Sequence, residues 1–413
     1  MITVIKAERI FDGKSETFLR NACVLVEGNK VSDLGVAVRI PAGAEVIDLG
    51  DSTLCPGFID AHTHLALDFS SGYNQALIDN FRMQIPEHAY RAASNAAKTL
   101  QAGFTTVRDV GSSFFIDVGL RDSITKGFVV GPRMLASVRA ISATGGHTDP
   151  TGELRFGATG READYTQGVG DGPDAMRRAV RFNVKYGADV IKFCASGGVL
   201  SLVNEVATPQ FTPAEMSALV DEAHRLHKRV AAHCHGDQAA KEAIVAGVDS
   251  IEHGSFLEDD TLRMMKASGT YLVPTLFTLE WLCGGSAQLT PEIDAKARAA
   301  RSARSSCFRR ALEIGVKIAY GTDAAVFPHG MNAKDFAIMA RLGMSTIAAL
   351  KSATSVNAEL LGVSQNVGTL DQGKFADLVG MPGDPAVDIT VTERVNFVMK
   401  DGVVSKHVVT PAF

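Results

Sequence analysis

Side chains that could bind metal ions follow apolar segments throughout the middle of this chain. The first two, His62 and His64, come at the end of an apolar segment that begins at Phe58. Imidazole and carboxylate groups are the usual protein ligands of zinc and similar ions. If each apolar segment is a strand of a parallel sheet, the carboxyl ends of the strands collect these side chains at one edge. The series in chain order is His62, His64, Lys192, His233, His253 and Asp323.

The pair His62 and His64 is a weak signal when taken alone. Side chains two residues apart in a strand point to the same side, so both imidazoles could bind one ion. Two exposed loop histidines would explain the pair equally well. The complete ordered series is far more demanding, and it indicates a metal centre built from several strand ends.

The segment Pro-Gly-Phe-Ile-Asp-Ala-His-Thr-His at 56–64 resembles the signature of the amidohydrolase superfamily of binuclear metal hydrolases. The ordered series of ligand types extends this resemblance over essentially the whole chain. The resemblance implies two divalent metal ions, with zinc as the expected metal. It implies that His62 and His64 bind the more buried ion and that His233 and His253 bind the second.

Lys192 is the unusual member of the series, because a protonated lysine cannot bind a cation. Burial at an apolar strand end should lower its pKa and leave a nucleophilic amine. The resemblance implies that carbon dioxide carboxylates this amine and that the carbamate bridges the two ions. The alternative is an unmodified lysine paired with an acid such as Glu205 or Asp109.

Asp323 follows the segment Ala-Tyr-Gly-Thr at 319–322, and the resemblance gives it metal contact and general acid/base duty. Two ions lower the pKa of bound water and polarise a carbonyl oxygen. A metal-bridging hydroxide then needs a proton acceptor as it attacks, and the leaving nitrogen needs a proton. One carboxylate could serve both needs. Alone, Asp323 would fit equally a turn aspartate that caps the next helix.

Two further histidines are candidates for substrate binding. His147, in a Gly-flanked loop, resembles the substrate-binding histidine of Xaa-Pro dipeptidase-like and imidazolonepropionase-like amidohydrolases. A donor there could bind a substrate carboxylate or the scissile carbonyl, and the alternative is an ordinary loop histidine. His235 lies two residues after His233 and shares its face. Some relatives that resemble proline-specific dipeptidases carry Tyr there, so strict proline specificity is not expected.

A helix that ends in Gly and is followed by a short apolar run recurs along the chain, for example at Gly247 and Gly315. Alternation of helices with buried strands indicates a parallel sheet. Eight such strands fit a closed (β/α)8 TIM barrel, with a doubly wound open sheet as the alternative. Only closure brings the first and last strands side by side. The expected strands are 57–62, 104–109, 133–138, 188–193, 229–233, 249–253, 271–275 and 317–322.

The two ends of the chain alternate apolar and polar residues. Hairpin-type turns are expected at Gly28-Asn29 and at Asp401-Gly402. Neither end is long enough for a robust sheet of its own, so residues 1–55 and 366–413 are predicted to form one small β domain. The resemblance implies that this domain is a discontinuous β-sandwich beside the barrel. Residues 56–365 form the barrel domain.

Composition limits the classes of function. The chain has 413 residues, 46% hydrophobic and 21% charged, with a net charge of −5. No basic run suggests nucleic acid, and no apolar segment approaches the ~18–20 residues that span a membrane. We expect a cytoplasmic homo-oligomer that acts on a small molecule. Six cysteines without a Cys-x-x-Cys pair should be reduced. Cys194 could line the site, whereas Cys234 should point away.

These observations favour a metal-dependent hydrolase that cleaves an amide or peptide bond. Dipeptides, N-acyl amino acids, and aromatic acids conjugated to amino acids all fit as carboxylate-bearing substrates. One alternative is a cyclic amidase of the imidazolonepropionase type, and another is a non-catalytic metal-binding barrel. An apolar wall of the pocket could come from Phe69, Tyr73, Phe277 and Trp281.

Overall fold

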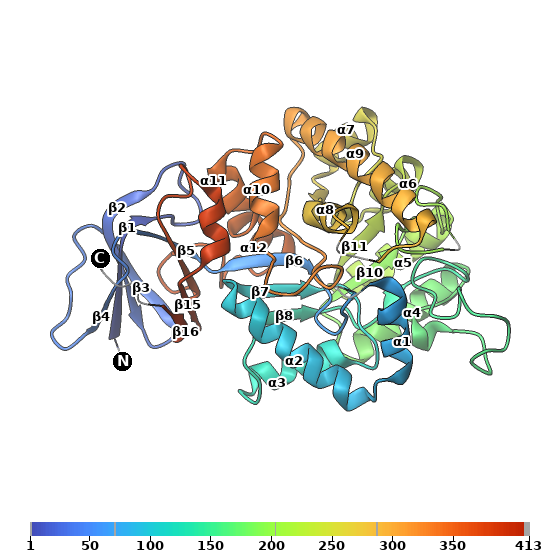
Figure 1. The fold of residues 1–413 in the computed structure, drawn as a ribbon, viewed down its shortest axis with the longest axis horizontal. Helices are drawn as coiled ribbons and strands as arrows, with labels where there is room; N and C mark the ends of the chain where they lie inside the picture. The colour runs from blue at the N-terminus through green and yellow to red at the C-terminus, as the bar shows by residue number, and fades with distance from the viewer. Residues whose placement is uncertain (1, 70–71, 203, 286–287, 409–413) are drawn as a thin grey trace.

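The computed structural model describes residues 2–69, 72–202, 204–285 and 288–408. A sheet built from both ends of the chain lies beside a larger part in which strands and helices alternate (Figure 1). Within the described residues, no helix is both long and apolar enough to cross a bilayer.

The sheet at the chain ends joins the two termini. Strand β5 pairs antiparallel with β14, and the expected turns at Gly28 and at Asp401-Gly402 connect β2 to β3 and β15 to β16. Hydrogen bonds join all eight strands in one sheet, in which β1 pairs with both β4 and β5. The packing of this sheet as a sandwich stays a prediction. The strands are β1 (Ile2–Ile10), β2 (Leu19–Glu27), β3 (Lys30–Gly35), β4 (Glu45–Asp48), β5 (Ser52–Pro56), β14 (Leu378–Pro382), β15 (Phe397–Lys400) and β16 (Val403–His407).

The larger part contains two groups of parallel strands, in the orders β6-β7-β8 and β13-β12-β11-β10-β9. Seven of the eight expected strands are present in these groups. The third expected strand is interrupted after Ala136, because Val138 adopts a positive φ of 67°. The strands are β6 (Phe58–Thr63), β7 (Phe104–Asp109), β8 (Arg133–Ala136), β9 (Ala140–Ile141), β10 (Val190–Cys194), β11 (Arg229–Cys234), β12 (Ser250–His253) and β13 (Tyr271–Val273).

The eighth expected strand, 317–322, is not a regular strand. Its backbone is shared between two neighbours: the Ala319 amide donates to Leu272 of β13 at 2.9 Å, and its Tyr320 carbonyl accepts from Ala61 of β6 at 2.9 Å. The Tyr320 amide donates instead to Ser352 at 3.2 Å, so no continuous ladder forms. The segment nevertheless connects β13 to β6 through backbone hydrogen bonds.

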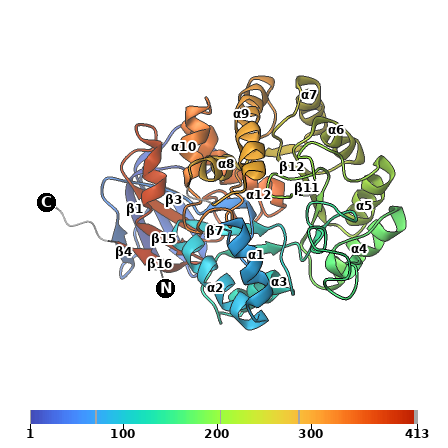
Figure 2. The same ribbon diagram turned by 45° about the vertical axis from the view of Figure 1, so that its right-hand side comes forward.

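Helices follow the strands and cover them from outside. Helices α4 to α7 succeed one another around β11 and β12 (Figure 2). The glycines expected to end helices do so: Gly247 and Gly315 have φ of 97° and 85°, the left-handed conformation that ends a helix. The helices are α1 (Tyr73–Arg82), α2 (Ile85–Gln101), α3 (Ile116–Thr125), α4 (Pro173–Lys185), α5 (Pro213–Arg225), α6 (Asp237–Ala246), α7 (Asp259–Ser268), α8 (Leu276–Cys283), α9 (Pro291–Ile314), α10 (Lys334–Arg341), α11 (Thr346–Ser352) and α12 (Ser355–Leu361), with short 3-10 turns η1 (Tyr165–Gln167) and η2 (Ile389–Arg394).

Candidate active site

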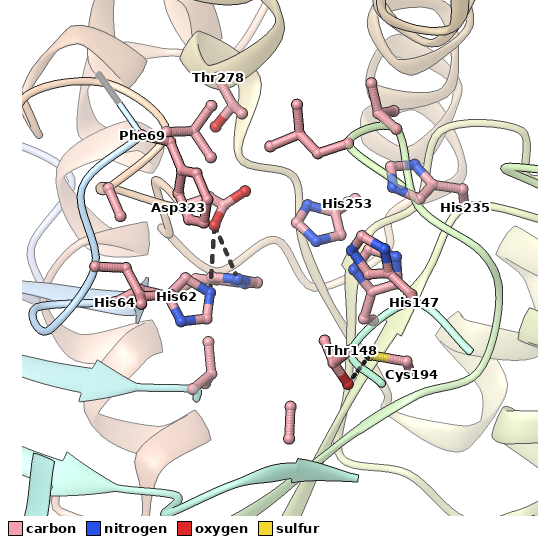
Figure 3. Close-up of a pocket in the computed structure, with 18 of the residues that line it drawn as sticks. His62, His64, Phe69, His147, Thr148, Cys194, His235, His253, Thr278 and Asp323 are labelled. Carbon is pink, nitrogen blue, oxygen red and sulfur yellow. Dashed lines mark hydrogen bonds and ion pairs between the residues drawn. The ribbon is translucent and has the colours of Figure 1, made fainter. Parts of the chain in front are cut away.

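A cavity of about 230 Å³ opens at the carboxyl ends of the parallel strands. All the site residues expected from the sequence line it. Figure 3 shows His62, His64 and Asp323 on one side, and His253, His235 and His147 on the other. The expected residues in its wall are His62, His64, His147, Lys192, His233, His235, His253 and Asp323.

The first group consists of His62, His64 and Asp323, whose ligand atoms all lie within 4.8 Å of one another. Nε2 of His62 and Nε2 of His64 lie 3.5 and 3.4 Å from the same Asp323 oxygen, Oδ1. The opposite ring nitrogens are already bonded: Nδ1 of His62 to Glu252 at 2.7 Å, and Nδ1 of His64 to the Gly111 carbonyl at 3.0 Å. Both Nε2 atoms are therefore oriented toward one point beside the carboxylate.

Glu252 and Arg108, which sequence reasoning did not select, orient His62 although neither lines the cavity. The Glu252 carboxylate binds Nδ1 of His62 with one oxygen and accepts from the Arg108 guanidinium with the other, at 2.8 Å. Both side chains are buried within β12 and β7. A carboxylate behind a histidine fixes its tautomer and increases its basicity as a ligand. The available signal was a pair of opposite charges inside two apolar strand segments.

The second group consists of His233, His235 and His253, which also have ligand atoms within 4.8 Å of one another. Nε2 of His233 binds the Gly197 carbonyl at 3.0 Å, so Nδ1 is the nitrogen available to an ion. Nδ1 of His253 binds the Thr275 hydroxyl at 2.8 Å, so Nε2 is available there. His235, expected to bind substrate, stacks on His253 with an interplanar angle of 7°.

This donor set fits divalent ions. Burial lowers the pKa of His62, His233 and His253 well below 6.5, and that of His64 to about 3. The imidazoles are therefore neutral, which is the form that binds metal. Each has one nitrogen held by a protein group and the other available, as metal-binding histidines do.

Lys192 of β10 is buried beside these groups, and burial lowers the pKa of its amine. Within the described part of the chain, no ion pair joins it to Glu205 or Asp109. Asp109 instead accepts from the Leu65 amide at 2.7 Å. Cys194 lines the cavity as expected, and its thiol lies 3.5 Å from the Thr148 hydroxyl.

Asp323 is held in place by the backbone around it. Its own φ is 62°, and its amide donates to the His62 carbonyl at 2.7 Å. The preceding Thr322 donates its hydroxyl to buried Asp60 at 2.6 Å. At Gly321, an added Cβ would lie 2.3 Å from Val273, so only glycine permits this close approach. Burial raises the pKa of Asp323 to about 7.

His147 reaches the cavity from the loop after β9. Its ring stacks on His233, with centroids 4.4 Å apart, and its amide donates to Gln210 at 2.9 Å. The ring lies directly on Gly198, where an added Cβ would be 2.1 Å from Cε1. Burial lowers the pKa of His147 to about 4, so the ring is neutral and can donate one hydrogen bond.

Apolar side chains form the outer wall, but only in part those expected. Phe69 lines the cavity, together with Leu279 and Leu282 of α8. Phe277 does not line it and packs on Phe327, with ring centroids 4.8 Å apart. The face of α8 that carries Leu279 and Leu282 lines the cavity, and Phe277 and Trp281 do not line it. The side chain of Tyr73 lies outside the described residues.

Comparison with known proteins agrees with this fold. A model of the amidohydrolase family matches residues 53–409. Ochratoxinase from Aspergillus niger is 32% identical over 95% of this chain and 84% of its own length. A solved structure of a Xaa-Pro dipeptidase with bound methionine is 38% identical, with a TM-score of 0.93 over 98% of this chain and 100% of that one. An imidazolonepropionase from Cutibacterium acnes is 25% identical over 90% of this chain and 89% of its own.

The chain therefore belongs to the amidohydrolase family. It is a hydrolase that acts on amide or peptide bonds.

Proposed function

We propose that this enzyme cleaves the amide or peptide bond of a small substrate that carries a free carboxylate. The observation that carries the proposal is that two groups of candidate metal ligands, one of which includes Asp323, line one cavity that also has apolar side chains in its wall. Dipeptides, N-acyl amino acids, and aromatic acids conjugated to amino acids are the proposed substrates. The solved Xaa-Pro dipeptidase holds methionine, which has such a carboxylate, in its active site.

We propose two divalent ions, zinc in the first instance. His62, His64 and Asp323 would hold one, and His233 and His253 the other. Lys192, carboxylated by carbon dioxide, would bridge them, and the lowered pKa of its buried amine supports this modification. When bound, such ions lower the pKa of bound water and polarise the substrate carbonyl.

The protein groups would then manage protons and orientation. Asp323 would accept the proton of the attacking water at its carboxylate and deliver it to the leaving nitrogen. A pKa near 7 suits a group that must both accept and donate a proton at neutral pH. His147 would donate a hydrogen bond to a substrate oxygen, because its ring is neutral and faces the cavity.

The proposal includes a closed (β/α)8 barrel over residues 56–365 and a separate β domain from residues 1–55 and 366–413. The backbone hydrogen bonds of 317–322 to both β13 and β6 support closure, and those of β5 to β14 support the composite β domain. A homo-oligomeric state and a cytoplasmic location stay predictions.

The test is turnover of a panel of N-acetyl amino acids and dipeptides by protein loaded with zinc, with chelator-treated protein as the control. Release of free amino acid that depends on metal supports the proposal. Metal-loaded protein that hydrolyses none of the panel contradicts it.

A cyclic amidase is the second candidate, because the imidazolonepropionase relative matches along most of the chain. The same panel extended by imidazolone propionate decides between them. Ring opening without cleavage of any linear amide would favour the second candidate.

A further inference from the structure

A buried arginine that the mechanism does not use reaches the cavity from α9. Arg304 is 3% exposed and lines the cavity near His235 and His253. Its helix presents Ala297 and Ala300 on the same buried face, so Arg304 interrupts a small apolar surface that packs against α8. A charged residue in such a position has a specific reason to be there.

Three of the five N–H groups of Arg304 are committed to the protein. Nε donates to the Ser255 hydroxyl at 3.1 Å, and Nη1 donates to the Thr275 carbonyl at 2.7 Å and hydroxyl at 3.0 Å. These bonds fix the plane of the guanidinium. Among the described residues, nothing accepts from the two hydrogens of Nη2.

The positive charge also has no carboxylate partner in the part of the chain that the structure describes. No ion pair of Arg304 forms with Asp323, Asp335 or any other described acid. A buried charge without a partner is costly to the folded protein. Because the Arg304 guanidinium lines the cavity, an anionic group of a bound substrate could pair with this charge.

We propose that Nη2 of Arg304 binds the free carboxylate of the substrate, on the amino-acid side of the scissile amide. This inference rests on the proposed function and deepens it, because it identifies the residue that selects carboxylate-bearing substrates. A planar guanidinium held on two sides is well suited to a carboxylate. Arg304 reaches His235 and His253 through the Ser255 and Thr275 hydroxyls, whereas His147 stacks on His233. We therefore assign the carboxylate to Arg304 and the scissile carbonyl to His147.

The same contacts also let Arg304 position His235 and His253, and the test must distinguish this role from binding of the substrate carboxylate. The Ser255 hydroxyl also binds Nδ1 of His235, at 2.8 Å, and the Thr275 hydroxyl binds Nδ1 of His253. Removal of Arg304 could therefore disturb two histidines without any loss of a substrate contact. A purely positional role would affect all substrates equally, whereas a carboxylate contact affects only those with the carboxylate.

The experiment compares N-acetyl-L-phenylalanine with its carboxamide, N-acetyl-L-phenylalaninamide, in the zinc-loaded wild type and in Arg304→Gln. We expect the wild type to prefer the acid at least tenfold in kcat/KM. In Arg304→Gln the acid should lose roughly ten- to a hundredfold, as for a hydrogen bond to a charged group, and the amide much less. Arg304→Lys should retain part of the preference, and Arg301→Gln, on the exposed face of the same helix, should retain all of it.

Binding of the product gives a readout that does not require turnover. Calorimetry should show L-phenylalanine binding to the wild type more tightly than L-phenylalaninamide, and Arg304→Gln should abolish the difference. Equal losses for acid and amide, or a wild type that does not discriminate between them in either assay, would overturn the assignment. If Arg304→Gln fails to fold, the wild-type comparison still tests the assignment, because it needs no variant. Absence of any amide hydrolysis would instead contradict the proposed function.

Discussion

Oε2 of Glu252 lies 2.7 Å from Nδ1 of His62, and both side chains are buried. The other Glu252 oxygen accepts from Arg108, whose guanidinium also donates to the Ala61 carbonyl in β6. One carboxylate thus links three strands, β6, β7 and β12, beneath the metal-ligand candidates. The orientation of His62 depends on a charge that lies outside the cavity.

Glu252→Gln should weaken metal binding. A glutamine has one acceptor and one donor group, so it cannot accept from both Arg108 and His62. Loss of such a carboxylate behind a histidine ligand costs roughly 10- to 100-fold in metal affinity or activity. Zinc titration against a competing chelator measures the effect, with exposed Glu258→Gln as the control. Wild-type affinity in Glu252→Gln would show that the contact is structural only.

Asp323→Asn should preserve the fold but remove most of the activity. The two side chains are nearly isosteric, yet an amide cannot accept the proton. Loss of a general acid/base costs roughly 10²- to 10⁴-fold in rate, and a weakened metal contact could add to it. Steady-state kinetics with parallel metal analysis separates the two effects. A variant with near wild-type kcat would exclude Asp323 from proton transfer.

Lys192→Ala should lose the bridging ligand, and with it metal content and most activity. Short carboxylic acids should restore part of the activity, because they can supply the missing bridging oxygens. Elemental analysis and turnover with and without added acetate test this, and exposed Lys185→Ala serves as the control. Two tightly bound ions in Lys192→Ala would argue against a bridging role.

Gly198→Ala should reproduce the kinetic defect of His147→Ala, although the histidine itself is not replaced. The new methyl group would occupy the space of the His147 ring, 2.1 Å from Cε1, so the ring must move. We expect a roughly ten- to hundredfold loss in kcat/KM in both variants, with unchanged metal content. The loss should be equal for substrates with and without a carboxylate if His147 polarises the scissile carbonyl. Gly119→Ala, where an added Cβ meets nothing within 4 Å, is the control. Loss of metal in either variant, or unaltered kinetics in His147→Ala, would contradict the assignment.

Metal binding should depend on pH through Asp323. Its pKa of about 7 is raised by burial, and an ion needs the deprotonated carboxylate. Protons therefore compete with metal below pH of about 7, so affinity should rise with pH and then level off above it. The histidines do not contribute in this range, because their pKa values are lowered. Affinity measured between pH of about 5.5 and 8 should lose this rise in Asp323→Asn. An unchanged pH profile in that variant would refute the role.

Local patterns in the sequence were enough to predict which residue types come to the strand ends. Apolar segments followed by His, Lys or Asp are such patterns, and helix-ending glycines such as Gly247 mark where each strand begins. Because parallel strands share one direction, these patterns also predicted that His62, His233 and Asp323 meet in one cavity. The hairpins at both chain ends were also predictable, because a hairpin turn is determined by a few neighbouring residues.

The residues that support and surround the candidate ligands could be identified only from the packing of the folded chain. Arg108 and Glu252 are far apart in the sequence and meet His62 only because β6, β7 and β12 converge. Arg304 reaches the cavity because α9 packs over α8, which periodicity within α9 cannot reveal. The rotation of α8 about its axis likewise places Leu279, and not Phe277, in the wall. Such contacts depend on how elements pack against one another, and packing is a property of the whole fold that no short segment encodes.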